Sequence, residues 1–358
     1  MRDTLSPLQG ANLSMAALLK QSPQWQDSVL GARCFSENTV ESRMQGHLDM
    51  PCMHVPMQRL DIGDSICEVW RGTGPLTQGR SGDIHYRHDE GVLFGVIVLS
   101  ETMFAAVADK TPLQQATESA YRQVFALLDT LRYPYLFRCW NYFADINTHS
   151  FGLERYRQFN QGRQDAFLTH GREVVGNVPA ASALGFGSSN SALGQLAIAF
   201  LAGRVAPLNI ENPRQVSAYR YPPQYGPRTP TFSRASLVRM GQDEVLFVSG
   251  TASIVGHATM HSENVVAQTR ETMTNIEAVL AEANRLASQP GFDLRDLHYM
   301  VYVRDPADLA QIRAELALRV GDPLNAVYLQ ADVCRRDLLL EIEATATHPA
   351  QSVSGQRA

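Results

Sequence analysis

The chain has 358 residues, of which 44% are hydrophobic and 19% are charged, and its formal net charge is −5. These values describe an ordinary globular protein that can bury a real core, and the length favours two domains. So small a charge excludes a general attraction to nucleic acid or anionic membranes. An anionic ligand must therefore be bound by locally placed arginines.

The first residues, MRDTLSP, lack the apolar segment of a signal peptide, and the chain has no apolar run of about 18 residues, the length that spans a membrane. We therefore expect a cytoplasmic protein that binds neither membrane nor nucleic acid. The five cysteines are an odd number without CxxC spacing. Free thiols are expected, with neither a disulfide framework nor a zinc site.

The first half of the chain shows strand and helix patterns in alternation. Residues 85–90, HYRHDE, mix side chains that could bind a metal, but the flanking glycines favour a solvated loop, so we predict no metal. A buried strand is predicted at 93–99 and a helix at 111–131, where apolar residues recur at three- and four-residue spacing. A second strand at 135–142 and a second helix at 153–169 follow.

The second half repeats this layout, with strands at 245–254 and 297–303 and helices at 262–287 and 306–320. The repeat predicts an α+β fold with two related halves of mixed β-sheet packed with long helices. The segment 205–230 is rich in proline and asparagine, which is typical of a boundary. We predict domains at 1–210 and 211–349, followed by a frayed tail at 350–358.

The last predicted strand carries two carboxylates. Alternation from residue 338 onward separates two sets of side chains onto opposite faces, namely Leu338, Leu340 and Ile342 against Leu339, Glu341 and Glu343. A carboxylate that points into a sheet core needs a partner or a task to compensate its desolvation. The pattern leaves two interpretations open: functional carboxylates, or carboxylates that simply face water.

Several arginines and tyrosines form a possible binding inventory for a small dicarboxylate. Guanidinium groups bind carboxylates in a bidentate manner, and tyrosine hydroxyls add neutral donors. A solvated surface charge is the alternative for any single arginine, and it is weakest for Arg138, Arg220 and Arg304, which occur in apolar or aromatic contexts. The candidates are Arg138, Tyr156, Arg163, Tyr219, Arg220, Arg234 and Arg304.

The run SGTASIVGH at 249–257 has neither the GxGxxG nor the P-loop pattern, so a nucleotide site is unsupported. Small residues at the end of a strand permit close approach of a ligand ring, and a tight turn between strand and helix is the alternative.

Five segments together resemble the chorismatase family, over about residues 50 to 347. They are 140–142 (WNY), 154–157 (ERYR), 218–222 (AYRYP), 249–253 (SGTAS) and 331–344. The resemblance is strongest to bacterial members that form 3- and 4-hydroxybenzoate for pigment and ubiquinone synthesis. The C-terminal half also resembles the Rid/YjgF-type fold, whose last strand has a similar Glu-Ile-Glu-Ala sequence.

The resemblance implies release of pyruvate from chorismate, a dianion, without metal or organic cofactor, to give 3-hydroxybenzoate and also 4-hydroxybenzoate. Glu341 matches the catalytic glutamate, a general acid for the enolpyruvyl methylene, which needs a raised pKa. Cys334 matches a product-determining cysteine, whose pKa Arg335 and Arg336 would lower if they point toward it. A buried structural cysteine is the alternative. Ala252 matches a substrate-binding position of the family. Some members that form 3-hydroxybenzoate look to have glycine at this position instead.

Two other functions stand beside this one. A Rid-type imine or enamine hydrolase fits the C-terminal half, but the large N-terminal half counts against it. A non-catalytic sensor could bind chorismate or a hydroxybenzoate in the same arginine-rich pocket. The expected partner in each case is a small molecule, and a monomer is plausible because the duplication would build within one chain a pocket that simpler relatives build between subunits.

Overall fold

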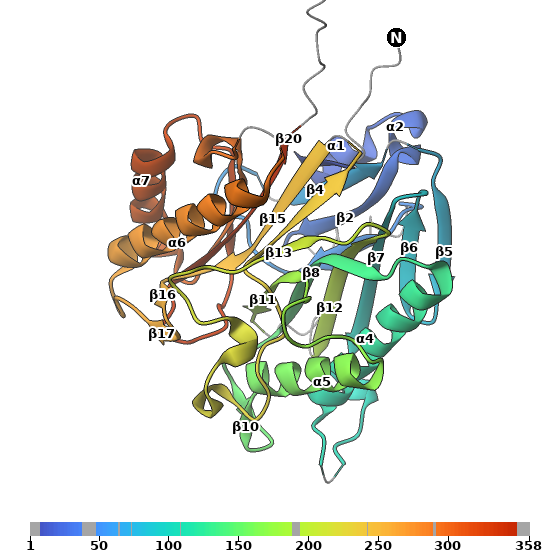
Figure 1. Ribbon diagram of the computed structural model, residues 1–358, viewed down its shortest axis with the longest axis horizontal. Coiled ribbons are helices and arrows are strands. Elements are labelled where there is room, and N and C mark those ends of the chain that lie inside the picture. The colour runs from blue at the N-terminus through green and yellow to red at the C-terminus, as the bar shows by residue number, and fades with distance from the viewer. Residues whose placement is uncertain are drawn as a thin grey trace, which may run out of the picture.

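The computed structural model describes residues 8–37, 48–63, 65–72, 74–107, 109–187, 194–241, 243–288 and 291–348. These residues form a mixed α+β fold with three sheets of four or more strands, packed against one another and flanked by helices (Figure 1). The α+β class that the sequence predicts is confirmed. The predicted frayed tail at 350–358 lies outside the described residues.

The N-terminal sheet has the order β1-β4-β2-β3. Its elements are β1 (Leu8–Leu13), α1 (Met15–Leu19), α2 (Pro23–Asp27), β2 (Val29–Phe35), β3 (Cys52–Val55) and β4 (Ile66–Gly72). Across the antiparallel β2–β4 pair, Arg33 lies opposite Glu68 and Cys34 lies opposite Cys67. The two cysteines form a disulfide, so the expectation of free thiols is wrong for them, because sequence spacing does not reveal which strands pair.

The middle sheet has the order β11-β8-β12-β7-β6-β5. Its elements are β5 (Thr77–Ser81), β6 (Ile84–His88), β7 (Val92–Ser100), α4 (Pro112–Leu131), β8 (Tyr135–Ala144), α5 (Arg155–Thr169), β11 (Ala180–Phe186) and β12 (Gln195–Gly203). The predicted strands and helices of this half are confirmed. The predicted loop at 85–90 is wrong in most of its length, because β6 pairs on both sides, with β5 and with β7.

The C-terminal sheet has the order β13-β14-β15-β20-β18-β19. Its elements are β13 (Leu208–Ile210), β14 (Ala235–Met240), β15 (Asp243–Thr251), α6 (Val265–Leu286), β18 (His298–Val303), α7 (Leu309–Val320), β19 (Ala326–Gln330) and β20 (Leu340–His348). All four predicted elements of this half are present. A 3₁₀ turn at Pro306–Asp308 opens α7, and Asp305 caps that turn by accepting a hydrogen bond from the Ala307 N–H.

The two six-stranded sheets have the same topology. Read from the opposite end, the middle sheet runs β5-β6-β7-β12-β8-β11, and each strand takes the place of its counterpart in β13-β14-β15-β20-β18-β19. In both sheets the last two strands are parallel. The predicted relation between the halves is therefore confirmed at the level of topology. The predicted domain boundary after residue 210 lies at the end of β13. Because β13 pairs with β14, this boundary would separate β13 from the C-terminal sheet to which it belongs.

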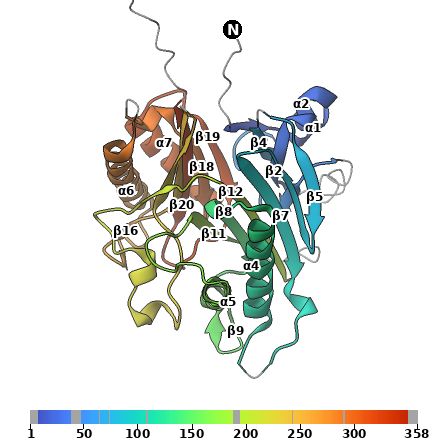
Figure 2. The ribbon, with the colours of Figure 1, turned by 45° about the vertical axis from the view of Figure 1, so that its right-hand side comes forward.

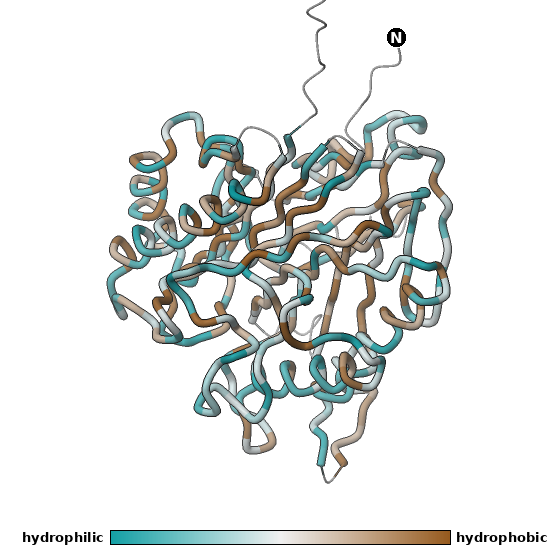
Figure 3. Tube along the Cα trace, viewed as in Figure 1, coloured by the Kyte–Doolittle hydropathy of each residue, from teal (hydrophilic) through white to brown (hydrophobic). Residues whose placement is uncertain are grey.

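The helices cover outer faces, and the sheets pack against each other inside. Figure 2 shows α6 and α7 on the C-terminal sheet, with α4 and α5 on the middle sheet. Hydrophobic segments accordingly follow the inner strands, and hydrophilic ones follow the outer turns of the helices (Figure 3). No helix in the described part of the chain is long and apolar enough to cross a membrane.

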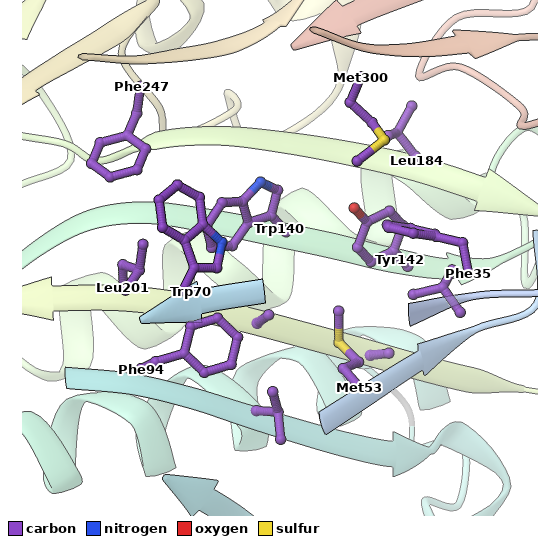
Figure 4. Packing of buried hydrophobic residues seen from close by; sticks show 14 of the residues in the cluster. Phe35, Met53, Trp70, Phe94, Trp140, Tyr142, Leu184, Leu201, Phe247 and Met300 are labelled. Carbon is purple, nitrogen blue, oxygen red and sulfur yellow. The ribbon is translucent and has the colours of Figure 1, made fainter. Parts of the chain in front are cut away.

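A large apolar cluster lies where the three sheets meet (Figure 4). Trp70 of β4 contacts Trp140 of β8 with ring centroids 6.0 Å apart, and it contacts Phe247 of β15 at 5.7 Å. One tryptophan of the N-terminal sheet thus touches both other sheets. Burial of aromatic surface of this size stabilises the three-sheet arrangement more than any surface contact can.

Candidate active site

A pocket of about 320 Å³ lies at the seam between the middle and C-terminal sheets. Strand β11, at the edge of the middle sheet, approaches β15, and two serines of the C-terminal sheet accept its backbone N–H groups. The Ala180 N–H donates to Ser236 Oγ at 3.0 Å, and the Ala181 N–H donates to Ser249 Oγ at 2.9 Å. Residues of β11, β15, β20, α5 and the loops around them therefore converge on one cavity.

Six of the ten site residues predicted from the sequence line this pocket. They are Tyr156, Arg163, Arg234, Ala252, Cys334 and Glu341. The polar lining also includes residues that the sequence did not single out as binding residues, namely Glu154, Arg157, Ser182, Tyr221, Tyr225, Thr259, Arg335, Arg336 and Asp337.

Glu341 points into the pocket from β20 because β15 is irregular beside it. The β15–β20 register shifts between Val248 and Thr251, which indicates a bulge at that point. A Cβ atom at Gly250 would lie 2.7 Å from the carboxyl carbon of Glu341 and would overlap its Oε1 atom. The small residue therefore makes room for a catalytic-type carboxyl group, whereas the sequence had suggested room for a ligand ring.

The Glu341 carboxyl is 4% exposed, so the water-facing interpretation of this residue is wrong. Burial, and then the nearby charge of Glu343, raise its pKa to about 8, although Arg138, Arg234 and a hydrogen bond with Cys334 act in the opposite direction. A carboxyl group with such a pKa holds its proton at neutral pH. Glu341 is therefore suited to act as a general acid.

Glu343 is buried as well, but it has strong cationic partners. Its Oε2 atom accepts a hydrogen bond from Arg138 Nη2 at 2.6 Å and another from the Ser182 hydroxyl. Its Oε1 atom accepts hydrogen bonds from Arg33 Nη2 and from the Tyr302 hydroxyl, both at 3.0 Å. Burial alone would raise the pKa of Glu343, but these partners outweigh it and hold the pKa below its usual range.

The Cys334 thiol lies beside Glu341 and is a neutral group. Burial and the neighbouring carboxyl of Glu341 raise its pKa to about 12, and the opposing effects of Arg335 and Arg234 are smaller. The expected lowering by Arg335 is present but is outweighed by burial, and Arg336 is not among the main groups that shift this pKa. Arg335 turns aside to stack on the Tyr225 ring, 4.3 Å from its centroid, and donates through Nη1 to the His257 carbonyl at 2.9 Å.

Five arginines line the pocket, against three carboxyl groups. Three of them, Arg163, Arg234 and Arg335, each hold a buried guanidinium nitrogen without a hydrogen-bond partner among the described residues. Arg234 otherwise donates through Nη2 to the Tyr221 hydroxyl at 2.9 Å. These three nitrogens are shielded from solvent, so the suitability of the lining for an anionic ligand rests on the excess of positive charge around the cavity.

The other four predicted residues do not line the pocket. Arg138 is occupied by Glu343, and Arg304 by Asp332 and the carbonyls of Leu338, Val333 and Arg335. Tyr219 and Arg220 lie on a 3₁₀ turn, Ala218–Arg220, in which Arg220 is exposed. The pocket geometry gives these four no direct contact with a ligand.

The 3₁₀ turn explains why Tyr221 was missed. The aromatic context favoured Arg220, but the turn leaves Arg220 exposed, and the adjacent Tyr221 is buried against Arg234. Tyr225, on the following turn at Pro223–Tyr225, contacts Tyr221 with ring centroids 5.2 Å apart. The sequence signal that could have indicated Tyr221 and Tyr225 as pocket residues is the frequency of tyrosine in this segment.

No group of three or more potential metal ligands occurs in the described ranges of the chain. The chemistry that the pocket offers is thus that of a buried acid, a neutral thiol and several cationic donors.

The family model and the relatives that match this chain agree with one another. A family model described as "Chorismatase FkbO/Hyg5-like, N-terminal" matches residues 68–202. A chorismatase from Streptomyces rapamycinicus is 37% identical over 78% of this chain and 82% of its own length. A 3-hydroxybenzoate synthase from Streptomyces hygroscopicus is 38% identical over 78% of this chain and 81% of its own.

A solved structure of a chorismatase is similar over nearly the whole molecule. It is 31% identical, covers 95% of this chain and 98% of its own, and has a TM-score of 0.80. The YjgF gene product from E. coli is similar over 39% of this chain and 98% of its own, at 20% identity and a TM-score of 0.29.

Proposed function

Since this chain belongs to the chorismatase family, we propose that it converts chorismate to 3-hydroxybenzoate and pyruvate, with 4-hydroxybenzoate as a second product. Hydroxybenzoate and pyruvate together contain all the atoms of chorismate, so the reaction needs no co-reactant. The observation that carries the proposal is a protonated, buried Glu341 in a pocket lined by five arginines.

Glu341 is the proposed general acid. It transfers its proton to the terminal methylene carbon of the enolpyruvyl ether, and a positive, oxocarbenium-like centre forms at the ether carbon. The carboxylate that remains lies in a buried site, where it stabilises that charge strongly. Cleavage of the bond between the ether oxygen and ring carbon C3 then releases pyruvate, which keeps that oxygen. Loss of the proton on C4 converts the remaining ring cation to 4-hydroxybenzoate. For 3-hydroxybenzoate, the oxygen of the C4 hydroxyl bonds to C3 and its bond to C4 breaks, and the ring again loses one proton as it becomes aromatic.

The arginines are the proposed clamps for the two carboxylates of chorismate. Arg163, Arg234 and Arg335 line the pocket, and their positive charges would attract these carboxylates. Tyr156 is a neutral hydroxyl donor, because burial raises its pKa far above neutral pH. With Glu341 protonated, the lining carries five positive and two negative side chains, which suits a dianion.

Cys334 is the proposed selector of product. Its neutral thiol lies against the acid and packs with Ala252, Ile254, Val333 and Leu338 in one small cluster. A thiol in this position occupies space that water would otherwise fill, so the cation is steered toward aromatisation. Cys334 takes no part in proton transfer in this proposal.

The test is incubation of the purified protein with chorismate, with pyruvate and aromatic products measured together. We expect one pyruvate per chorismate consumed, and hydroxybenzoate as the aromatic product. Glu341→Gln keeps the shape of the side chain but cannot donate the proton, so kcat should fall by about 10²- to 10⁴-fold in a folded protein.

Two outcomes would contradict the proposal. Tight binding of chorismate without consumption would indicate a sensor, and release of ammonia from a 2-imino acid would indicate an imine hydrolase. A near wild-type rate in Glu341→Gln would remove this residue from the mechanism.

A further inference from the structure

Glu341 and Glu343 form a pair of buried carboxyl groups on the same face of β20, separated by one residue. Two buried carboxylates so close together cannot both be ionised without a large cost, so at neutral pH the pair holds one proton. For catalysis that proton must lie on Glu341, which lines the pocket, and not on Glu343, which does not. Something in the fold must therefore distinguish the two sites.

The difference lies in the partners of each carboxyl group. Glu343 meets Arg33 of β2, Arg138 of β8, Ser182 of β11 and Tyr302 of β18, and all four donate to it. Glu341 has the Cys334 thiol as its hydrogen-bond partner, and Arg138 and Arg234 act on it only through their charges. The proton is therefore displaced from Glu343 and left on Glu341.

Arg33 is the member of this set that comes from outside the two sheets that form the pocket. It belongs to the N-terminal sheet and is fully buried, and its guanidinium lies 4.1 Å from the centroid of the Trp140 ring. Its Nε donates to Glu68 Oε2 at 2.8 Å, its Nη1 donates to the Tyr142 hydroxyl, and its Nη2 reaches Glu343. It does not line the pocket.

We propose that Arg33 is a positioning residue, which keeps Glu343 ionised and thereby leaves the transferable proton on Glu341. The inference rests on the proposed acid role of Glu341 and extends it to a sheet that contributes no pocket-lining residue. Glu68 fixes the guanidinium from the opposite strand, β4, and Tyr142 and Tyr302 remain neutral because burial raises their pKa values.

The first experiment measures the steady-state kinetics of Arg33→Met, a substitution of similar length without charge. Glu343 then takes the proton in part of the population, so kcat should fall by about tenfold or more, one pKa unit being a factor of ten. KM should change by less than about twofold, because Arg33 does not touch the pocket. Arg33→Lys, which retains the charge, should recover much of kcat.

The second experiment removes the competing carboxyl group. In Glu343→Gln, the repulsion between the two carboxyl groups is lost and Arg138 loses its anionic partner, whereas Arg33 keeps Glu68. The pKa of Glu341 should therefore fall, and the decline of kcat with rising pH should begin at lower pH. Adding Arg33→Met to this variant removes a nearby positive charge and leaves Glu68 without its partner, so the decline should move back to higher pH. Arg33→Met should thus lower kcat in the wild-type background but extend the activity of Glu343→Gln to higher pH. A purely structural role of Arg33 does not predict these opposite effects.

The third experiment locates the proton without using activity. Infrared spectra near neutral pH should contain a protonated carboxyl band in the wild type that disappears in Glu341→Gln. In Arg33→Met, part of the band should persist when Glu341→Gln is added, because Glu343 now carries the proton. This readout separates the two proposals, since it remains valid even if the wild type releases no pyruvate from chorismate.

A matched control is Arg239→Met, which breaks another cross-strand pair, with Glu244 at 2.9 Å, away from the pocket. It should leave kcat and its pH dependence unchanged. Near-ultraviolet circular dichroism establishes which variants are folded. The proposal is overturned if folded Arg33→Met keeps the wild-type kcat and pH profile, or if its carboxyl band disappears with Glu341→Gln as completely as in the wild type.

Discussion

At the scale of single residues, the two glutamates of β20 show how far a sequence pattern reaches. Alternation placed Glu341 and Glu343 on one face, and the structure confirms this, with Leu340 and Ile342 packed in the apolar cluster beneath α6. The pattern could not say which carboxyl group holds a proton. That depends on Arg33, more than three hundred residues away in sequence, and on Arg138, which looked like a ligand-binding residue.

The pH dependence of turnover follows from Glu341. Its pKa is raised to about 8, and the protonated form is the active acid. We expect kcat for pyruvate release to be nearly constant below this pH and to fall about tenfold per pH unit above it. Stopped assays across the range, with stability checked at each pH, measure this. A decline that begins well below neutral pH would contradict the assignment.

The role of Cys334 is tested by Cys334→Ala. Removing the sulfur opens space beside Glu341, so water can reach the cation and a dihydroxy-cyclohexadiene acid should replace part of the hydroxybenzoate. The rate of pyruvate release should change by less than about tenfold, because the thiol is not the acid. Chromatography of the products measures the ratio, and an unchanged ratio would refute a selecting role.

At the scale of secondary-structure elements, β20 differs from its topological counterpart, β12. Strand β12 has the sequence QLAIAFLAG, without a charged residue, whereas β20 carries two carboxyl groups that face the middle sheet. Helices and strands were predicted well in both halves because their apolar periodicity is strong. The bulge in β15 was not predicted, because one small residue in a strand fits several local structures.

Gly250→Ala tests the importance of that bulge. The added Cβ would overlap the Glu341 carboxyl group and would lie 3.1 Å from the Cβ of Ser182, so the acid must move. Displacement of a reacting group by about 1 Å can cost about 10²-fold in rate, and we expect a loss of kcat of that order.

Gly187→Ala is the matched control, since nothing lies within 4 Å of its added Cβ. A folded Gly250→Ala enzyme with wild-type kcat would show that the bulge does not position the acid.

At the scale of the whole molecule, the pocket is lined by residues of the middle and C-terminal sheets. The charged groups that act on its glutamates come from all three sheets, because Arg33 belongs to the N-terminal sheet. The duplication of the six-stranded unit was visible in the sequence because each half repeats strand, helix, strand and helix. The N-terminal sheet was not, since its strands pair out of chain order, as β1-β4-β2-β3, without long helices among the described residues that connect them. Long-range pairing of this kind is set by the fold and leaves little local signal.

The meeting of three sheets at Glu343 has a consequence for the time course of folding. Its partners come from β2, β8, β11 and β18, so the proton assignment is complete only when all three sheets have docked. Near-ultraviolet dichroism reports the docking of Trp70 against Trp140. During refolding from denaturant, we expect secondary structure to return first, and pyruvate release to return together with the tryptophan signal. Activity that recovers before this signal would mean that the acid forms without the N-terminal sheet. If the two signals return together as expected, enzyme activity is the most demanding probe of whether a molecule in the sample has finished folding.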